Sequence, residues 1–342
     1  MKFFIDSKSS VIFARSFIFC LAVFLLGYGC KPVGSHKPVE GDPEAKKAIK
    51  VVATTGMIKD LVENIGGDHV SVVGLIGSGV DPHLYKPTIS DVKKLQQAEF
   101  IFYNGLKLEG KMGDILEKIK SDGRRTYAVC ENLTELEKYL IDEGEGHVDP
   151  HVWMDVNGWM AAADVVARAL ADHYPDLKND FVASSKIYKT ELEALNAYCR
   201  VSLSSIPESQ RILVTAHDAF NYMARAYGLS VRGIQGISTE SEAGVREIED
   251  LVDFLVESKI PAVFVESSVS DKNVKALIEG AEAKKWQVEI GGELFSDAMG
   301  IEGTYRGTYI GMIDHNITTI TRSLGGEAPE SGLNGKLKTS TE

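Results

Sequence analysis

The tripeptide Asp-Pro-His occurs twice in the chain, and its histidines, His83 and His151, are the first residues whose type suggests chemistry. Proline fixes its own φ and restricts the residue before it, so each histidine follows a stiff, non-helical step. His217 ends a strand-like run, and Asp297 follows the last such run. Three imidazoles and one carboxylate form a four-ligand set that suits zinc. A bidentate carboxylate would raise the coordination number, which manganese tolerates.

Acidic residues near these histidines are candidates to orient the rings, by accepting a hydrogen bond from the ring nitrogen that faces away from the metal. They are Asp81, Asp149, Asp155 and Glu240. The residue types alone also leave two other interpretations open. Histidines of such a chain are usually surface or core residues, and three histidines also hold catalytic zinc in hydrolases. In a hydrolase, however, Asp297 would fill the position that catalysis needs open.

The elements that position these residues are short β-branched and aromatic runs that alternate with helical patterns, which predicts βαβ units and parallel sheets. The strand-like runs are 50–55, 70–76, 100–105 and 125–130 in the first half, and 211–217, 230–236, 261–267 and 286–292 in the second. Loops at the carboxyl ends of parallel strands converge on a binding crevice. His217 occupies such a position and Asp297 follows one. The four ligands come from four distant segments, two from each half.

Between the two halves lies a stretch without a strand signal. It breaks near Pro175 and then continues to Ser205 without Gly or Pro, which predicts one long helix. The fold class is therefore α/β, with two doubly wound (βα)4-type lobes joined by one long rigid helix. We predict an N-terminal α/β lobe over 49–156, a helical linker over 157–206 and a C-terminal α/β lobe over 207–324. The polar residues 325–342 are predicted to be a disordered tail.

The N-terminus carries basic residues before a short apolar run, the charge pattern of a signal peptide. Gly29 precedes Cys30, which predicts a lipoprotein signal over 1–29, an acylated Cys30 and a flexible tether over 30–48. An ordinary cleaved signal peptide is the alternative. No later segment is apolar enough to span a membrane. The other thiols of the processed chain, Cys130 and Cys199, have no metal-ligand spacing and are interpreted as buried apolar residues.

The chain of 342 residues is long for a single core, and its net charge is −12. An acidic chain without a basic stripe argues against nucleic acid as a partner.

Several long segments resemble the cluster A-I, or TroA-like, metal-binding proteins of bacterial zinc and manganese ABC importers. These segments include DPHLYKPTISDVKKLQQAEFIFYNGLKLE, DPHVWMDV, LVTAHDAFNYMARAYGL, IQGISTESEAG, VFVESSVS and LFSDAMGIEGTYRGTYIGMIDHNITTI. The resemblance extends from about residue 49 to residue 324. It implies two α/β lobes with one Zn2+ or Mn2+ ion as cargo at their interface, and its ligand positions fall on His83, His151, His217 and Asp297.

The resemblance also implies a function and partners. The chain is not expected to be an enzyme. It is expected to be a monomeric extracytoplasmic lipoprotein that is anchored to the membrane by lipid and delivers metal to an ABC permease and its ATPase subunit. Some manganese-specific members have Glu where this chain has His217, and some zinc-specific members have a His-rich loop where this chain has only a short segment with His147. Both zinc and manganese therefore fit as cargo. A surface adhesin whose metal site is structural is the second alternative.

Overall fold

The computed structural model describes residues 48–131, 133, 139–144 and 146–337. The predicted signal peptide, Cys30 and nearly all of the predicted tether lie outside these residues, so they stay predictions. Among the described residues, no helix has the length and apolarity needed to cross a membrane.

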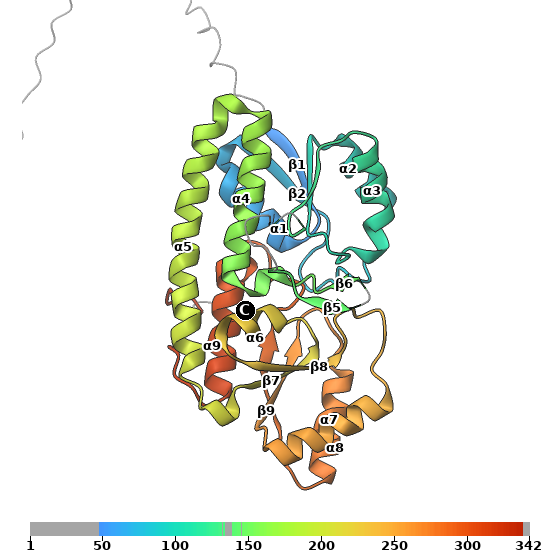
Figure 1. Ribbon diagram of the computed structural model, residues 1–342, viewed down its shortest axis with the longest axis vertical. Helices are drawn as coiled ribbons and strands as arrows, with labels where there is room; N and C mark the ends of the chain where they lie inside the picture. The colour runs from blue at the N-terminus through green and yellow to red at the C-terminus, as the bar shows by residue number, and fades with distance from the viewer. Residues whose placement is uncertain (1–47, 132, 134–138, 145, 338–342) are drawn as a thin grey trace, which may run out of the picture. The chain divides into compact units, whose positions relative to one another are not determined.

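The N-terminal lobe contains four parallel strands in the order β2-β1-β3-β4. Figure 1 labels β1 and β2 of this sheet. They are β1 (Ile49–Ala53), β2 (Val70–Gly74), β3 (Phe100–Tyr103) and β4 (Thr126–Ala128). The connecting helices are α1 (Gly56–Gly66), α2 (Ile89–Gln97) and α3 (Gly113–Ser121). Helix α2 begins at Thr88, whose hydroxyl accepts from the Asp91 N–H while the Asp91 carboxylate accepts from the Thr88 N–H. This capping box fixes where the loop after β2 ends.

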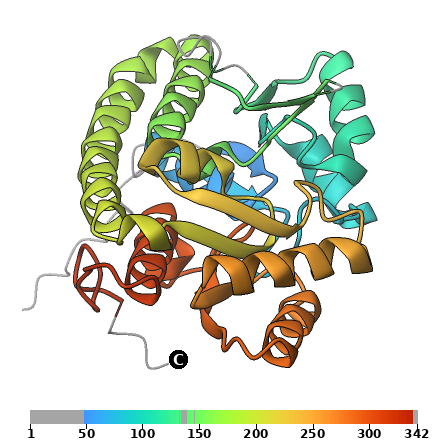
Figure 2. The same cartoon turned by 60° about the horizontal axis from the view of Figure 1, so that its bottom comes forward.

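The C-terminal lobe also alternates parallel strands with helices. Its strands are β7 (Ile212–His217), β8 (Ser230–Gln235), β9 (Ala262–Glu266) and β10 (Glu289–Leu294). They form two parallel hydrogen-bonded pairs, β7 with β8 and β9 with β10, and β7 lies beside β9. The helices are α6 (Asn221–Tyr227), α7 (Val245–Ser258), α8 (Lys272–Ala283) and α9 (Tyr309–Ser323). Figure 2 shows α7 and α8 together, away from the long green helices. All eight predicted strands are present, which confirms the parallel α/β class.

The predicted stretch without strands is helical. Helix α4 (Val156–His173) ends before the 3-10 turn η4 (Pro175–Leu177), and α5 (Lys178–Ser204) follows. With 27 residues, α5 is about 40 Å long. It packs against α4, against α1 of the first lobe and against α9 of the second. Figure 1 shows it beside α4 and α9. The other 3-10 turns are η1 (Gly67–His69), η2 (Gly110–Met112), η3 (Val152–Met154), η5 (Glu208–Gln210) and η6 (Tyr305–Gly307).

One hydrophobic core runs through both lobes. It joins Val51 and Phe100 of the first sheet, Leu192 and Leu195 of α5, and Phe264 of the second sheet in a single cluster of buried residues. Two smaller clusters fill the outer faces, one under α2 and α3 and the other under α7 and α8. Because close-packed cores resist deformation, this shared core opposes a wide hinge motion between the sheets.

Two features differ from the sequence prediction. A short antiparallel hairpin, β5 (Asp142–Gly144) and β6 (His147–Val148), precedes the second Asp-Pro-His. The prediction of a disordered tail is wrong for residues 325–337, which pack against α9. The backbone N–H of Leu333 donates to the fully buried Asp314 carboxylate at 2.8 Å, and the Glu327 N–H donates to Ser205 Oγ at 2.7 Å. A buried carboxylate needs such donors, and the polar tail supplies one.

Candidate metal centre

Both Asp-Pro-His tripeptides form the same turn. Oδ1 of Asp81 accepts a hydrogen bond from the His83 N–H at 2.8 Å, and Oδ1 of Asp149 accepts one from the His151 N–H at 2.9 Å. Asp side chains favour this bond to the backbone two residues on, and the intervening proline has no N–H to compete for it. The local sequence therefore fixes the backbone conformation at each histidine without contacts from the rest of the fold.

The other two predicted ligands come from the carboxyl ends of strands in the C-terminal lobe. His217 is the last residue of β7. Asp297 lies in the loop after β10, which ends at Leu294. The edge where parallel strands end is where such sheets bind ligands.

The structure brings all four side chains together. One ligand atom from each of His83, His151, His217 and Asp297 lies within 4.8 Å of the others. The Nε2 atoms of the three histidines lie 3.5, 3.3 and 3.2 Å from the Asp297 carboxylate oxygens, in that order. Ligand atoms about 2.1 Å from a tetrahedral ion are about 3.4 Å apart, so the spacing fits an ion at the centre.

The polar atoms at this point have no hydrogen-bond partner. They are Nε2 of His83, His151 and His217 and both carboxylate oxygens of Asp297, and all four residues are buried. Buried polar atoms are nearly always hydrogen-bonded, because leaving one unpaired costs about 1–3 kcal/mol. Five unpaired atoms that face one point therefore indicate a ligand at that point. A cation would interact with all five atoms at once.

Two of the rings are held from behind by buried carboxylates. Nδ1 of His151 lies 2.7 Å from Asp149 Oδ1, and Nδ1 of His217 lies 2.5 Å from Glu266 Oε2. The other Glu266 oxygen accepts from the His217 N–H at 2.8 Å. These contacts leave Nε2 of each ring to face the centre, as is usual for histidines that bind metal.

Of the four acids predicted to orient the rings, Asp149 contacts a ring and the other three contact other groups, whereas a fifth acid, Glu266, was not predicted. Asp81 contacts the backbone of His83 and not its ring, Asp155 caps α4 and accepts from the Tyr139 hydroxyl, and Glu240 pairs with Lys111. Only Asp149 lies where predicted. Glu266, at the end of β9, was missed because its closeness to His217 depends on β7 lying beside β9.

The four groups are also coupled electrostatically. Burial favours neutral imidazole, but the negative charges of Asp149 and Asp297 outweigh it and raise the pKa of His151 to about 9. Glu266 and Asp297 likewise raise the pKa of His217 well above its ordinary value. Burial lowers the pKa of His83, whereas His217 and His151 outweigh burial and hold the pKa of Asp297 well below its usual range. The imidazolium forms of His151 and His217 and the ionised form of Asp297 therefore favour one another.

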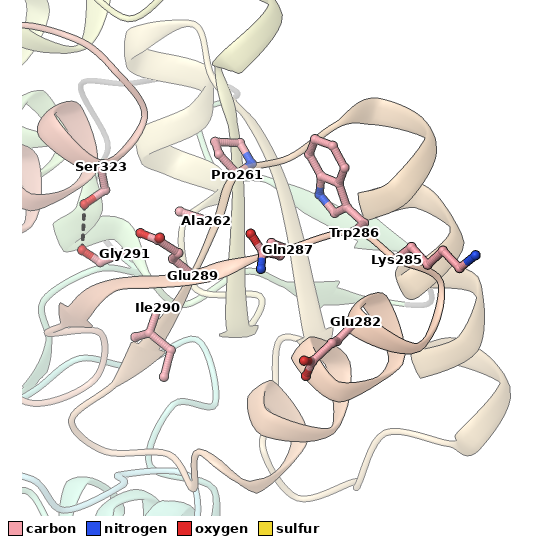
Figure 3. Close-up of a pocket in the computed structure, with 10 residues that line it drawn as sticks. All are labelled: Pro261, Ala262, Glu282, Lys285, Trp286, Gln287, Glu289, Ile290, Gly291 and Ser323. Carbon is pink, nitrogen blue, oxygen red and sulfur yellow. Dashed lines mark hydrogen bonds between the residues drawn. The ribbon is translucent and has the colours of Figure 1, made fainter.

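A cleft of about 690 Å3 has one of the four residues, Asp297, in its wall. It is lined by Gly56, Lys59 and Ser78 of the first lobe and by Asp297 and Gly300 of the second. A second cavity, of about 940 Å3, lies near the start of β9 and β10 and contains none of the four residues (Figure 3). We therefore assign no role in the centre to that cavity.

Comparison with known proteins decides the family. The model of the ZnuA family, described as "Zinc-uptake complex component A periplasmic", matches residues 51–323. The chain belongs to this family. Members of the ZnuA family are solute-binding components of uptake systems and not enzymes, so the alternative of a metal-dependent hydrolase is excluded.

Three relatives show how similar the chain is to known members. It is 48% identical to the manganese-binding lipoprotein MntA of Bacillus subtilis, over 82% of this chain and 91% of that one. It is 46% identical to the zinc-binding protein TroA of Treponema pallidum, over 80% of this chain and 88% of that one. The metal ABC transporter substrate-binding lipoprotein SsaB of Streptococcus sanguinis is 33% identical over 81% and 89%. A solved TroA structure superposes with a TM-score of 0.78, at 45% identity, over 81% of this chain and 99% of that chain.

The first prediction concerns pH. Histidine ligands must be neutral to bind metal, so a divalent cation must displace protons from His151 and His217. Because the pKa of His151 is raised to about 9, affinity should keep rising up to about pH 9 instead of levelling off just above pH 6.5. In a pH-buffered zinc titration, proton release that vanishes by about pH 7.5 would contradict this.

The same pKa shifts predict opposite pH trends for the stability of the metal-free protein and for the stabilisation by zinc. A raised histidine pKa stabilises the metal-free protein fully below about pH 6.5, and this contribution is lost as the pH rises through about 9. The melting temperature of EDTA-treated protein should therefore fall over this interval, while the increase caused by zinc should grow.

The second prediction concerns Glu266. Replacing Glu266 by Gln should lower zinc affinity about 10- to 100-fold, because the ring of His217 loses the carboxylate that orients it. Glu289→Gln is the matched control, since Glu289 is an exposed acid at the other end of the neighbouring strand. Equal affinities of the two variants in chelator competition would show that Glu266 does not support the centre.

Proposed function

We propose that this chain is the extracytoplasmic solute-binding component of a metal ABC importer, and that it captures one Zn2+ or Mn2+ ion with His83, His151, His217 and Asp297. The observation that carries the proposal is the convergence of five buried, unpaired nitrogen and oxygen atoms on one point. The relatives support it, since MntA is named for manganese and TroA for zinc.

Both metals fit the ligand set. Three imidazole nitrogens favour zinc, because zinc stands above manganese in the general order of divalent affinities. A carboxylate that binds through both oxygens would give the higher coordination number that manganese accepts, and both oxygens of Asp297 face the centre. The ion is cargo, so the centre serves delivery and not catalysis.

The partners follow from the same role. We propose delivery to a membrane permease driven by an ATPase subunit, with the chain itself acting as a monomer. We also propose that Cys30 carries a lipid that holds the protein at the outer side of a membrane. The lipoprotein names of MntA and SsaB support an anchor of this kind. We propose no adhesive role, because no feature of the described residues points to a host ligand.

The third prediction tests the ligand set. Replacing His83, His151, His217 or Asp297 by Ala should lower zinc affinity by more than about 100-fold, which exceeds the usual loss for residues behind the ligands. His69→Ala and His173→Ala are the controls, because His69 pairs with Asp180 and His173 with the Tyr127 hydroxyl. Titration against a chromophoric chelator at neutral pH measures each affinity. The proposal is wrong if any two of the four variants bind as tightly as the controls.

A further inference from the structure

His83 is held differently from the other three proposed ligands. The rings of His151 and His217 each have a buried carboxylate behind them, supplied by Asp149 and Glu266. Among the described residues, no hydrogen bond reaches the ring of His83, and only its backbone N–H is bound, by Asp81. The position of His83 therefore depends on what holds the segment that carries it.

The segment that carries His151 is fixed to the C-terminal lobe. The Tyr222 hydroxyl donates to the Asp149 carbonyl at 2.8 Å, Trp153 Nε1 donates to the Ser296 carbonyl at 2.9 Å, and the Tyr309 hydroxyl donates to the Trp153 carbonyl at 2.8 Å. All three bonds are buried. Buried, satisfied networks of this kind rigidify a structure. These three bonds tie the His151 segment to the lobe that carries His217 and Asp297, although the chain places His151 before the long helix. One further buried bond, from Asn104 Nδ2 to the Pro150 carbonyl at 3.0 Å, joins the segment to the first lobe.

The segment that carries His83, residues 77–85, is fixed more weakly. Much of its outer side is exposed, including Val80 and Leu84 at 38% and 47%. Two side-chain hydrogen bonds tie it to the C-terminal lobe. Ser78 Oγ donates to the Gly300 carbonyl at 2.7 Å, and Thr239 Oγ1 donates to Asp81 Oδ2 at 2.5 Å. The second bond matters most, because the other oxygen of Asp81 holds the His83 N–H.

Two ion pairs flank these hydrogen bonds, Lys59 with Glu302 and Lys111 with Glu240. The Glu302 side chain is 79% exposed, and both members of the second pair are 43% exposed. Exposed pairs contribute little to stability. The hydrogen bonds from Ser78 and Thr239 are therefore the contacts whose loss should free residues 77–85.

The cleft lies where such a movement would open the centre. Its walls include Gly77 and Ser78 on one side and Asp297 and Gly300 on the other. Breaking the bond between Ser78 and Gly300 would widen this cleft beside Asp297, whose side chain is buried. Gly79, at φ +69°, occupies the left-handed region next to Ser78, a conformation that glycine adopts without strain.

We infer that metal enters and leaves when residues 77–85 carry His83 away from a fixed group of His151, His217 and Asp297. Ser78 and Thr239 are positioning residues that keep His83 at the centre and thereby set the rate of metal dissociation. This inference rests on the proposed function. His83 is thus the mobile ligand, and the other three ligands stay together and hold the ion until a partner takes it.

The test compares variants that lose or keep the hydroxyl. Thr239→Val and Ser78→Ala should each raise the zinc dissociation rate about three- to tenfold, the change expected for one hydrogen bond. Thr239→Ser and Ser78→Thr keep a donor and should retain the original rate. Ser241→Ala, an exposed position of the same loop as Thr239, controls for loop substitutions. Stopped-flow mixing of zinc-loaded full-length protein with excess chelator gives each rate. The double variant should multiply the two effects, because the bonds reach different elements.

Equal dissociation rates in the hydroxyl-free and hydroxyl-keeping variants would overturn the inference. Hydrogen exchange of the unmodified protein, with and without zinc, gives a second test that needs no variant. Zinc should protect residues 77–85 more than residues 291–303, and the reverse would show that the loop bearing Asp297 moves instead. A chain that binds no divalent metal would contradict the proposed function. Tight binding with unchanged rates would contradict only the inference about His83.

Discussion

A buried carboxylate with no hydrogen-bond donor is the constraint on which the rest of this structure depends. Both oxygens of Asp297 face three imidazole nitrogens that also lack partners. The negative charge of Asp297 helps to raise the pKa values of His151 and His217. A divalent cation would balance that charge and would also satisfy every nitrogen. The raised histidine pKa values and the lowered pKa of Asp297 are two consequences of this single arrangement.

The fold keeps this arrangement from relaxing. His217 and Glu266 end the neighbouring strands β7 and β9, and the core behind them continues through α5 into the first lobe. Because that core is shared, Asp297 cannot escape its surroundings by a wide separation of the sheets. The smaller segment that carries His83 can still move. It is held to the C-terminal lobe by hydrogen bonds and not by the shared core.

The sequence predicts much of this because the relevant signals are local. Strand-like runs mark all eight parallel strands, and the Asp-Pro-His turns orient His83 and His151 by bonds that span two residues. Contacts between distant segments are not visible at that level. Glu266 supports His217 only because two strands lie side by side, while Asp155 and Glu240, chosen for their closeness in sequence or their charge, serve as a helix cap and a surface ion pair. A sequence also suggests two ligands from each lobe, whereas the Tyr222 and Trp153 hydrogen bonds group three ligands on one side.

The coordination of the ion in the protein is the most direct test of this account. X-ray absorption at the zinc edge, on protein loaded with one equivalent, should show three imidazole nitrogens at about 2.0–2.1 Å and carboxylate oxygen at about 2.0–2.2 Å. The multiple scattering should be that of three rings. A shell with fewer than three imidazoles, or one dominated by water oxygens, would contradict the claim that His83, His151, His217 and Asp297 enclose the metal.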